Sequence, residues 1–221
     1  LYESSTDSSS NDHQQGKSME YIALILFIFS TSGTPGPNNI MILTSGVNHG
    51  IRGSLPHVFG VNIGFLVMIR CVGLGIMSLF QQWPFLHQLI QILGISYLFY
   101  LALKIATMPV NSELNSDKKP FSFLQAAAFQ WVNPKAWVIC VSAIVAFSSP
   151  NTNVVEQVLI ISGFYFIFGL PCSFAWLMVG KWLQNILTHD VYVKRFNRIM
   201  ALILLTSLYP MLSEIITTFS A

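Results

Sequence analysis

Two short polar segments interrupt apolar stretches of this sequence, and both contain asparagine next to proline. The first is Thr-Pro-Gly-Pro-Asn-Asn at residues 34–39, inside the apolar run 21–43, and the second is Asn-Pro-Lys at residues 133–135. Proline fits the first position of a helix, and asparagine is a favoured cap just before it. Each segment therefore predicts a helix that breaks and restarts. The amides at the new N-terminus carry partial positive charge and can bind an anion such as a carboxylate.

The composition indicates that these breaks lie within a membrane. Hydrophobic residues make up 53% of the chain and charged residues only 9%, whereas about a quarter of the residues in soluble domains are charged. The mean hydropathy is +0.59. We therefore predict a polytopic protein of the lipid bilayer. Its net charge of +2 is too small to suggest a nucleic acid as partner.

Lys135 is the residue of the second break that is hardest to explain as structure alone. A charge near the centre of a span costs at least about 2.5–3.5 kcal/mol. The acidic residues of the apolar runs, Glu20, Glu156 and Glu214, lie towards the ends of the runs and not near Lys135. We therefore expect Lys135 to lack a protein partner and to face substrate or water, where it would exchange a proton during transport. The alternative is a lysine that snorkels along a kinked helix.

Six apolar runs are long enough to cross a bilayer, for which about 20 residues are needed. They are residues 20–45, 54–80, 85–107, 122–148, 154–181 and 196–218. The sequence thus predicts an all-α membrane protein of six transmembrane helices, with broken helices in spans one and four. Residues 1–18 are polar and are expected to form a disordered tail before a six-span transporter domain, residues 19–221.

The basic residues predict how these spans are oriented. Arg52 lies in the first short loop, Lys118 and Lys119 in the third, and Lys181, Lys194 and Arg195 in the fifth, while the second and fourth loops have none. Because short cytoplasmic loops are rich in Lys and Arg, we expect both termini to be periplasmic.

With three spans in each half, the two halves enter the membrane from opposite sides. We predict an inverted repeat, with residues 19–107 as the first repeat, a cytoplasmic loop at 108–121, and residues 122–221 as the second repeat. Each repeat then carries its break in its first span, so both breaks would meet near the middle of the membrane.

A third polar position completes the predicted site. Asn62 lies between Gly60 and Gly64, on a face of small residues suited to close helix packing. We expect it either to bond to a neighbouring helix or to contact the ligand, and both roles place span two beside the breaks. The predicted substrate-binding residues are Pro35, Gly36, Pro37, Asn38, Asn39, Asn62, Trp131, Asn133, Pro134 and Lys135.

Other classes of protein fit the sequence less well. A thiol–disulfide electron carrier needs two membrane cysteines that can meet, and although Cys140 follows the second break, the first break has no cysteine. We find no HExxH or GxSxG motif of a hydrolase, no metal-ligand spacing and no sign of a cofactor. A passive small-solute channel remains open.

The same segments resemble the LysE/RhtB family of bacterial amino-acid exporters. The matching motifs are residues 34–39, 129–136, 48–52, 60–64 and 93–104. The resemblance covers the chain from about residue 20 to its end. It implies a six-span protein of the bacterial inner membrane that exports a small amino acid or a derivative, driven by protons. Residues 34–40 are similar to the cysteine and O-acetylserine exporter branch, whereas Phe65 stands where many members have an acidic or small residue. Whether the protein is a homo-oligomer is left open.

Overall fold

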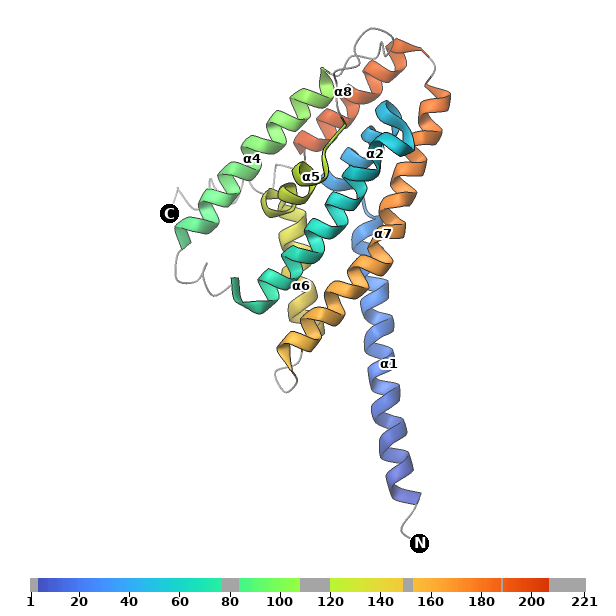
Figure 1. The fold of residues 1–221 in the computed structure, drawn as a ribbon, viewed down its shortest axis with the longest axis vertical. Coiled ribbons are helices and arrows are strands. Elements are labelled where there is room, and N and C mark those ends of the chain that lie inside the picture. The colour runs from blue at the N-terminus through green and yellow to red at the C-terminus, as the bar shows by residue number, and fades with distance from the viewer. Residues whose placement is uncertain (1–3, 77–83, 108–119, 149–152, 188, 207–221) are drawn as a thin grey trace.

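The computed structural model describes residues 4–76, 84–107, 120–148, 153–187 and 189–206, and within these ranges every element is a helix (Figure 1). The elements are α1 (Ser4–Gly33), α2 (Pro37–Cys71), η1 (Val72–Ile76, a π-helical turn), α4 (Pro84–Ala106), α5 (Phe123–Phe129), η2 (Gln130–Val132, a 3₁₀ turn), α6 (Pro134–Phe147), α7 (Val154–Ile186) and α8 (Asp190–Thr206).

Both predicted helix breaks are confirmed. Helix α1 ends at Gly33 and α2 begins at Pro37, with Gly36 as an extended residue between them. The turn η2 ends at Val132 and α6 begins at Pro134. Asn133 caps α6, because its Oδ1 accepts a hydrogen bond from the Lys135 amide at 3.1 Å. Proline at the first helical position and asparagine before it thus act as the sequence rules predict.

Helix α2 contains the turn between the predicted spans one and two. Gly50 has φ 66° and ψ −171°, so α2 is two helices joined by a sharp kink. A positive φ is accessible to glycine because it has no Cβ. One residue therefore reverses the chain, where the sequence suggested a longer loop between residues 45 and 54.

The N-terminal end of the chain differs from the tail predicted for residues 1–18. Helix α1 begins at Ser4 and continues without interruption into the apolar part of the chain. Figure 1 shows its N-terminal part extending past the other helices. Once a helix has formed, adding residues at its end costs little free energy. The apolar part of α1 is the helix from which the polar residues continue.

Among the residues that the structure describes, two helical stretches are long and apolar enough to cross a membrane, namely Pro37–Gly75 and Val154–Ile186. Shorter apolar helices cover Ser18–Gly33, Ile95–Ala106 and Pro134–Phe147. An all-helical, apolar chain agrees with a membrane protein. Parts of the predicted second and sixth spans and most of the loop at 108–121 lie outside the described residues, so the count of six spans stays a prediction.

Helix α2 is the centre of the bundle, packed against α7 on one side and α5 on another. A Cβ on Gly60 would overlap the Phe123 carbonyl oxygen, and one on Gly64 would lie 2.5 Å from the Ala127 Cα. The two glycines therefore let α2 and α5 approach at backbone distance, as the small-residue pattern predicted. Helix α1 packs on α7, and α4 on α8.

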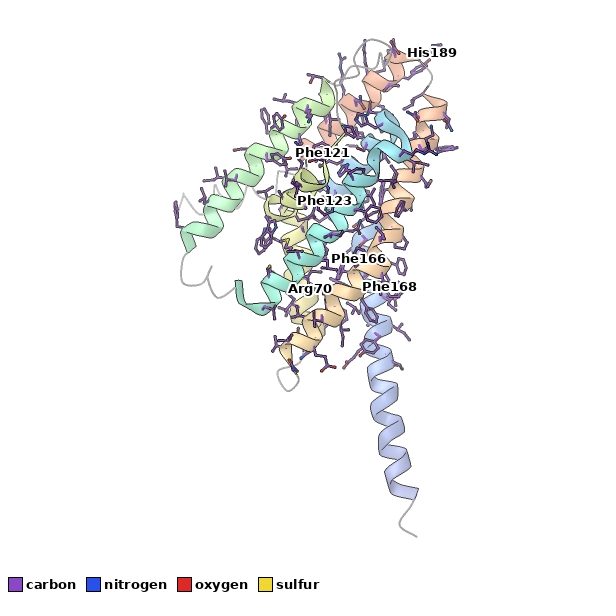
Figure 2. All side chains as sticks on the ribbon, in the orientation of Figure 1. Arg70, Phe121, Phe123, Phe166, Phe168 and His189 are labelled. Carbon is purple, nitrogen blue, oxygen red and sulfur yellow. The ribbon has the colours of Figure 1, made fainter. Side chains whose placement is uncertain are left out.

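The two ends of the bundle carry different polar groups. Figure 2 labels His189 at one end, beside the turn between α7 and α8, and Arg70 near the other. The Arg70 Nε donates a hydrogen bond to the buried Ser162 Oγ of α7 at 3.1 Å. Lys104, at the end of α4, lies with its Nζ 5.0 Å from the centre of the Phe121 ring.

Candidate functional site

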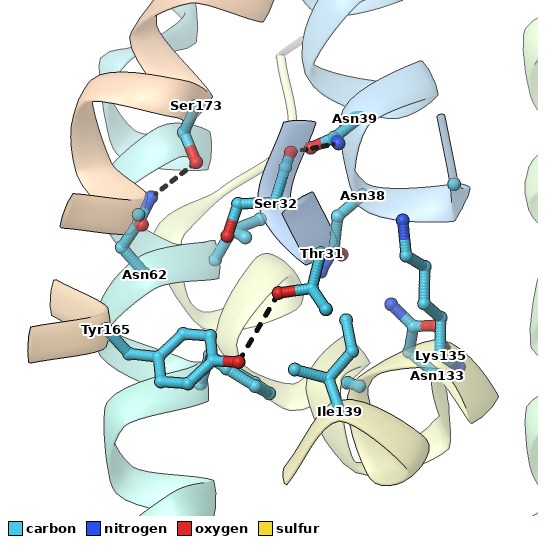
Figure 3. Close-up of a pocket in the computed structure, with 15 residues that line it drawn as sticks. Thr31, Ser32, Asn38, Asn39, Asn62, Asn133, Lys135, Ile139, Tyr165 and Ser173 are labelled. Atoms are coloured by element: carbon cyan, nitrogen blue, oxygen red, sulfur yellow. Dashed lines mark hydrogen bonds between the residues drawn. The ribbon is translucent and has the colours of Figure 1, made fainter. Parts of the chain in front are cut away.

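A polar cavity lies where the two helix breaks meet, between α1, α2, α6 and α7 (Figure 3). Its volume of about 70 Å³ is several times what one water molecule needs. The residues that line it come from both halves of the chain. They are Thr31, Ser32, Gly36, Asn38, Asn39, Val61, Asn62, Phe65, Asn133, Lys135, Ala136, Ile139, Tyr165, Gly169 and Ser173.

Helix N-termini, with partial positive charge, and a helix C-terminus, with partial negative charge, meet at this cavity. The first turns of α2 and α6 contribute residues to its wall, and first-turn amides have no acceptor within their own helix. The last turn of α1 contributes Thr31 and Ser32, and terminal carbonyls give a helix C-terminus partial negative charge. The cavity can therefore present amide donors to an anionic group and oxygen acceptors to a cationic one.

Two amide side chains tie the breaks together. The Asn38 Nδ2 donates to the Gln130 Oε1 at 2.8 Å, and the Gln130 Nε2 donates to the Asn38 Oδ1 at 3.1 Å. Gln130 is fully buried and also donates to the Ala126 carbonyl at 2.9 Å. The Asn38 side chain is therefore engaged with the second half of the chain.

Lys135 has protein partners, contrary to our expectation. Its Nζ donates to the Thr34 carbonyl and to the Thr34 Oγ1, both at 2.8 Å, and reaches the Pro35 carbonyl at 3.4 Å. These oxygens directly follow the C-terminus of α1, where carbonyls have no helical donor. The expectation was wrong because it considered only acidic partners, and a broken helix supplies acceptors without any charge.

Asn39 acts on the same helix end. Its Nδ2 donates to the Ser32 carbonyl at 2.7 Å and to the Thr34 carbonyl at 2.8 Å. Asn39 and Lys135 together supply donors to the end of α1, so the first break is held by one residue from each half of the chain.

Asn62 bonds to a neighbouring helix, the first of the two roles that the sequence allowed. Its Nδ2 donates to the Val58 carbonyl at 2.8 Å and to the Ser173 Oγ of α7 at 3.0 Å. The same side chain lines the cavity. It therefore joins α2 to α7 and leaves its Oδ1 as an acceptor.

The remaining wall combines aromatic rings with hydroxyl groups. The Tyr165 hydroxyl lies 3.4 Å from the Thr31 Oγ1, and its ring packs edge-on against Phe65 with 5.2 Å between ring centres. The Thr31 hydroxyl donates to the Phe27 carbonyl at 2.8 Å, so the Tyr165 hydroxyl is the donor in the pair. Ile139 of α6 adds an apolar surface.

The structure brings six of the ten predicted site residues to the cavity wall: Gly36, Asn38, Asn39, Asn62, Asn133 and Lys135. Pro35, Pro37 and Pro134 are not in the wall and act through the backbone breaks that they help to form. Trp131 is also not in the wall. Its carbonyl accepts a hydrogen bond from the Trp137 Nε1 at 2.8 Å, and the two rings pack edge to face.

Sequence reasoning missed the wall residues at the end of α1 and along α7, namely Thr31, Ser32, Tyr165, Gly169 and Ser173. Thr31 and Ser32 directly precede the first break, and that position was a usable signal. The residues of α7 had no local signal, because a hydroxyl or a glycine in an apolar helix is common.

No group of His, Cys, Asp or Glu in the part of the chain that the structure describes could hold a metal ion. Cys71, Cys140 and Cys172 are free thiols. The donor set of the cavity, amides, hydroxyls and one ammonium, suits a small polar organic molecule.

Comparison with known proteins agrees with this geometry. The family model described as LysE type translocator matches residues 29–207, which include both breaks and every residue of the cavity wall. The chain belongs to this family. The LysE/RhtB resemblance is thereby confirmed, and the chain is a translocator and not an enzyme.

Similar proteins in this family carry a substrate in their names. Two are the "Cysteine/O-acetylserine efflux protein" of Salmonella typhimurium (strain LT2) and that of Escherichia coli (strain K12). Each is 34% identical over 175 residues, which cover 79% of this chain and 88% of the relative. No solved structure matches the chain.

Proposed function

We propose that this protein is a secondary transporter that exports a small amino acid or amino-acid derivative across the bacterial inner membrane, coupled to protons. The observation that carries this proposal is that the first turns of α2 and α6 line one polar cavity together with Lys135. The substrates named in its relatives make cysteine and O-acetylserine the first candidates.

The substrate carboxylate binds at the end of the cavity formed by Gly36, Asn133 and Lys135. The first-turn amides of α6 supply donors there, as in other carriers with broken helices. Lys135 adds a positive charge that moves from the oxygens of Thr34 to the carboxylate when substrate enters. Because the lysine changes its hydrogen-bond partners in each transport cycle, it is suited to gain and lose a proton in the cavity.

The pairing of helices supports an inverted repeat. The broken helix of the first half, α1, packs on α7, and its counterpart in the second half, α5, packs on α2. If the first half is superposed on the second, the α1–α7 pair falls on the α5–α2 pair. The α4–α8 pair falls on itself, because α4 and α8 are the last spans of the two halves. We therefore infer two three-span repeats, residues 19–107 and 122–221, that rock around the cavity.

Both termini are proposed to face the periplasm. Arg52 and Val154 are exposed residues near opposite ends of the bundle, so Arg52→Cys and Val154→Cys, in a variant lacking Cys71, Cys140 and Cys172, report the two sides. We expect a membrane-impermeant maleimide added to whole cells to label only Val154→Cys. Labelling of both positions from outside would contradict the orientation.

Transport itself is tested in inverted membrane vesicles. We expect accumulation of labelled cysteine and O-acetylserine that rises when the vesicle lumen, which corresponds to the periplasm, is acidic and falls when this proton gradient is collapsed. Vesicles preloaded with unlabelled substrate should show counterflow, which a carrier gives and a channel does not. Absence of accumulation for a panel of small amino acids would contradict the proposed function.

A further inference from the structure

The cavity has a vacant place on α7 beside Gly169. A Cβ at this position would lie 3.7 Å from the Asn62 Oδ1 and 3.7 Å from the Ser32 Oγ. Both distances are ordinary van der Waals contacts, so packing alone does not require glycine here. The absent side chain leaves a space bordered by one oxygen from α2 and one from α1.

The two oxygens at this place are suited to accept hydrogen bonds. Both amide hydrogens of Asn62 are used, one by the Val58 carbonyl and one by Ser173. Only its Oδ1 is left to face the space, and the side chain is 8% exposed. The Ser32 hydroxyl adds two acceptor lone pairs.

An ammonium group matches these acceptors, because it has three donors and no acceptor. Figure 3 shows Asn62 and Ser173 on one side of the cavity and Asn133 and Lys135 on the other, with Ser32 between them. The positive helix N-terminus and the lysine are thus separated from the oxygen acceptors. A zwitterion fits this arrangement in one direction only.

We propose that the α-ammonium group of the substrate binds beside Gly169, between the Asn62 Oδ1 and the Ser32 Oγ, while its carboxylate faces Lys135. This inference rests on the proposed function and assigns a subsite within its cavity. Uncharged oxygens hold an ammonium less strongly than a carboxylate would. The site therefore binds a zwitterion and still releases it, as an exporter requires.

The test compares Gly169→Ala with Gly163→Ala on the same helix. A Cβ at Gly163 meets nothing within 4 Å, so this control introduces the same methyl group outside the cavity. Because hydrogen bonds to a charged group contribute about 1.5–3 kcal/mol, we expect the KM for cysteine to rise about tenfold or more in Gly169→Ala. The control should keep the wild-type KM.

A second readout separates loss of the ammonium site from a general loss of binding. 3-Mercaptopropionate is cysteine without its amino group, and we expect it to compete with labelled cysteine about tenfold less well than unlabelled cysteine does in wild type. In Gly169→Ala and in Ser32→Ala this preference should shrink towards one. Ser32→Ala leaves α7 unchanged, so the test does not depend on Gly169→Ala folding.

The outcomes distinguish the two proposals. If wild-type vesicles transport no amino acid, the proposed function fails. If wild type transports cysteine while both variants keep its preference over 3-mercaptopropionate, the ammonium site is wrong and the proposed function stands.

Discussion

Replacing Lys135 with methionine is expected to reduce transport more than about a hundredfold while the protein still inserts in the membrane. The substitution removes the donors to the Thr34 carbonyl and hydroxyl, which now receive hydrogen bonds of 2.8 Å. It also removes the positive charge proposed to receive the substrate carboxylate. Hydrogen bonds to charged groups contribute about 1.5–3 kcal/mol each, so losing two or more to the substrate carboxylate accounts for an effect of this size. Uptake in inverted vesicles, normalised to protein in the membrane, measures it.

Lys135→Arg separates binding from proton coupling. A guanidinium group can still donate to Thr34 and to a carboxylate, but it stays protonated. We expect this variant to give counterflow and to lose stimulation by a proton gradient. The matched control is Lys181→Met, because the Lys181 Nζ bonds to the Gln184 Oε1 at 2.6 Å and does not line the cavity. Normal rates and an unchanged pH dependence in Lys135→Met would show that the lysine only snorkels.

The helix breaks could be predicted from the sequence because local rules determine them. Pro37 and Pro134 lack an amide hydrogen and fit the first helical position, so each marks where a helix restarts. Gly60 and Gly64 were likewise readable, since small residues spaced four apart in an apolar run indicate close packing. In each case the information lies within a few residues of the feature.

The partners across the cavity could not be predicted, because they depend on how distant helices pack. Lys135 bonds to Thr34, which lies 101 residues earlier in the chain. Asn62 bonds to Ser173, which lies 111 residues later. Tyr165 and Gly169 reach the cavity only because α7 packs along α2 and α1. The sequence identifies polar groups that need partners, whereas the fold decides which groups meet.

This division explains the error over Lys135. The insertion cost of a lysine is a property of the residue and was correctly read as a demand for a partner. Its partner is the backbone of a broken helix, and the residue types in the sequence do not show that these carbonyls will lie next to Lys135. A break therefore has two consequences at once: it creates amide donors at one helix end and unpaired carbonyls at the other.

Substituting alanine for Gly180 is expected to be among the most destabilising single changes in the bundle. A Cβ on Gly180 would overlap the Leu43 carbonyl oxygen and would lie 3.1 Å from the Gly46 Cα. These are backbone atoms, so no side chain can turn aside, and α7 must move away from α2. The same contact holds α7, which carries Ser173, against the part of α2 before Gly50, which carries Asn38 and Asn39, so the cavity wall should separate with it.

The direction of the change in stability distinguishes a backbone clash from an effect of helix propensity. Alanine is favoured over glycine within a helix by about 1 kcal/mol, so Gly163→Ala, with no atom within 4 Å of its Cβ, should keep or raise the thermal midpoint. Overpacking typically costs about 1–3 kcal/mol, and a clash between backbones falls at the upper end. We therefore expect Gly180→Ala to lower the midpoint of the detergent-solubilised protein by several degrees, measured by fluorescence-detected size exclusion after heating. Equal midpoints for the two variants would mean that α2 and α7 do not pack at backbone distance, and the cavity between them would then need a different architecture.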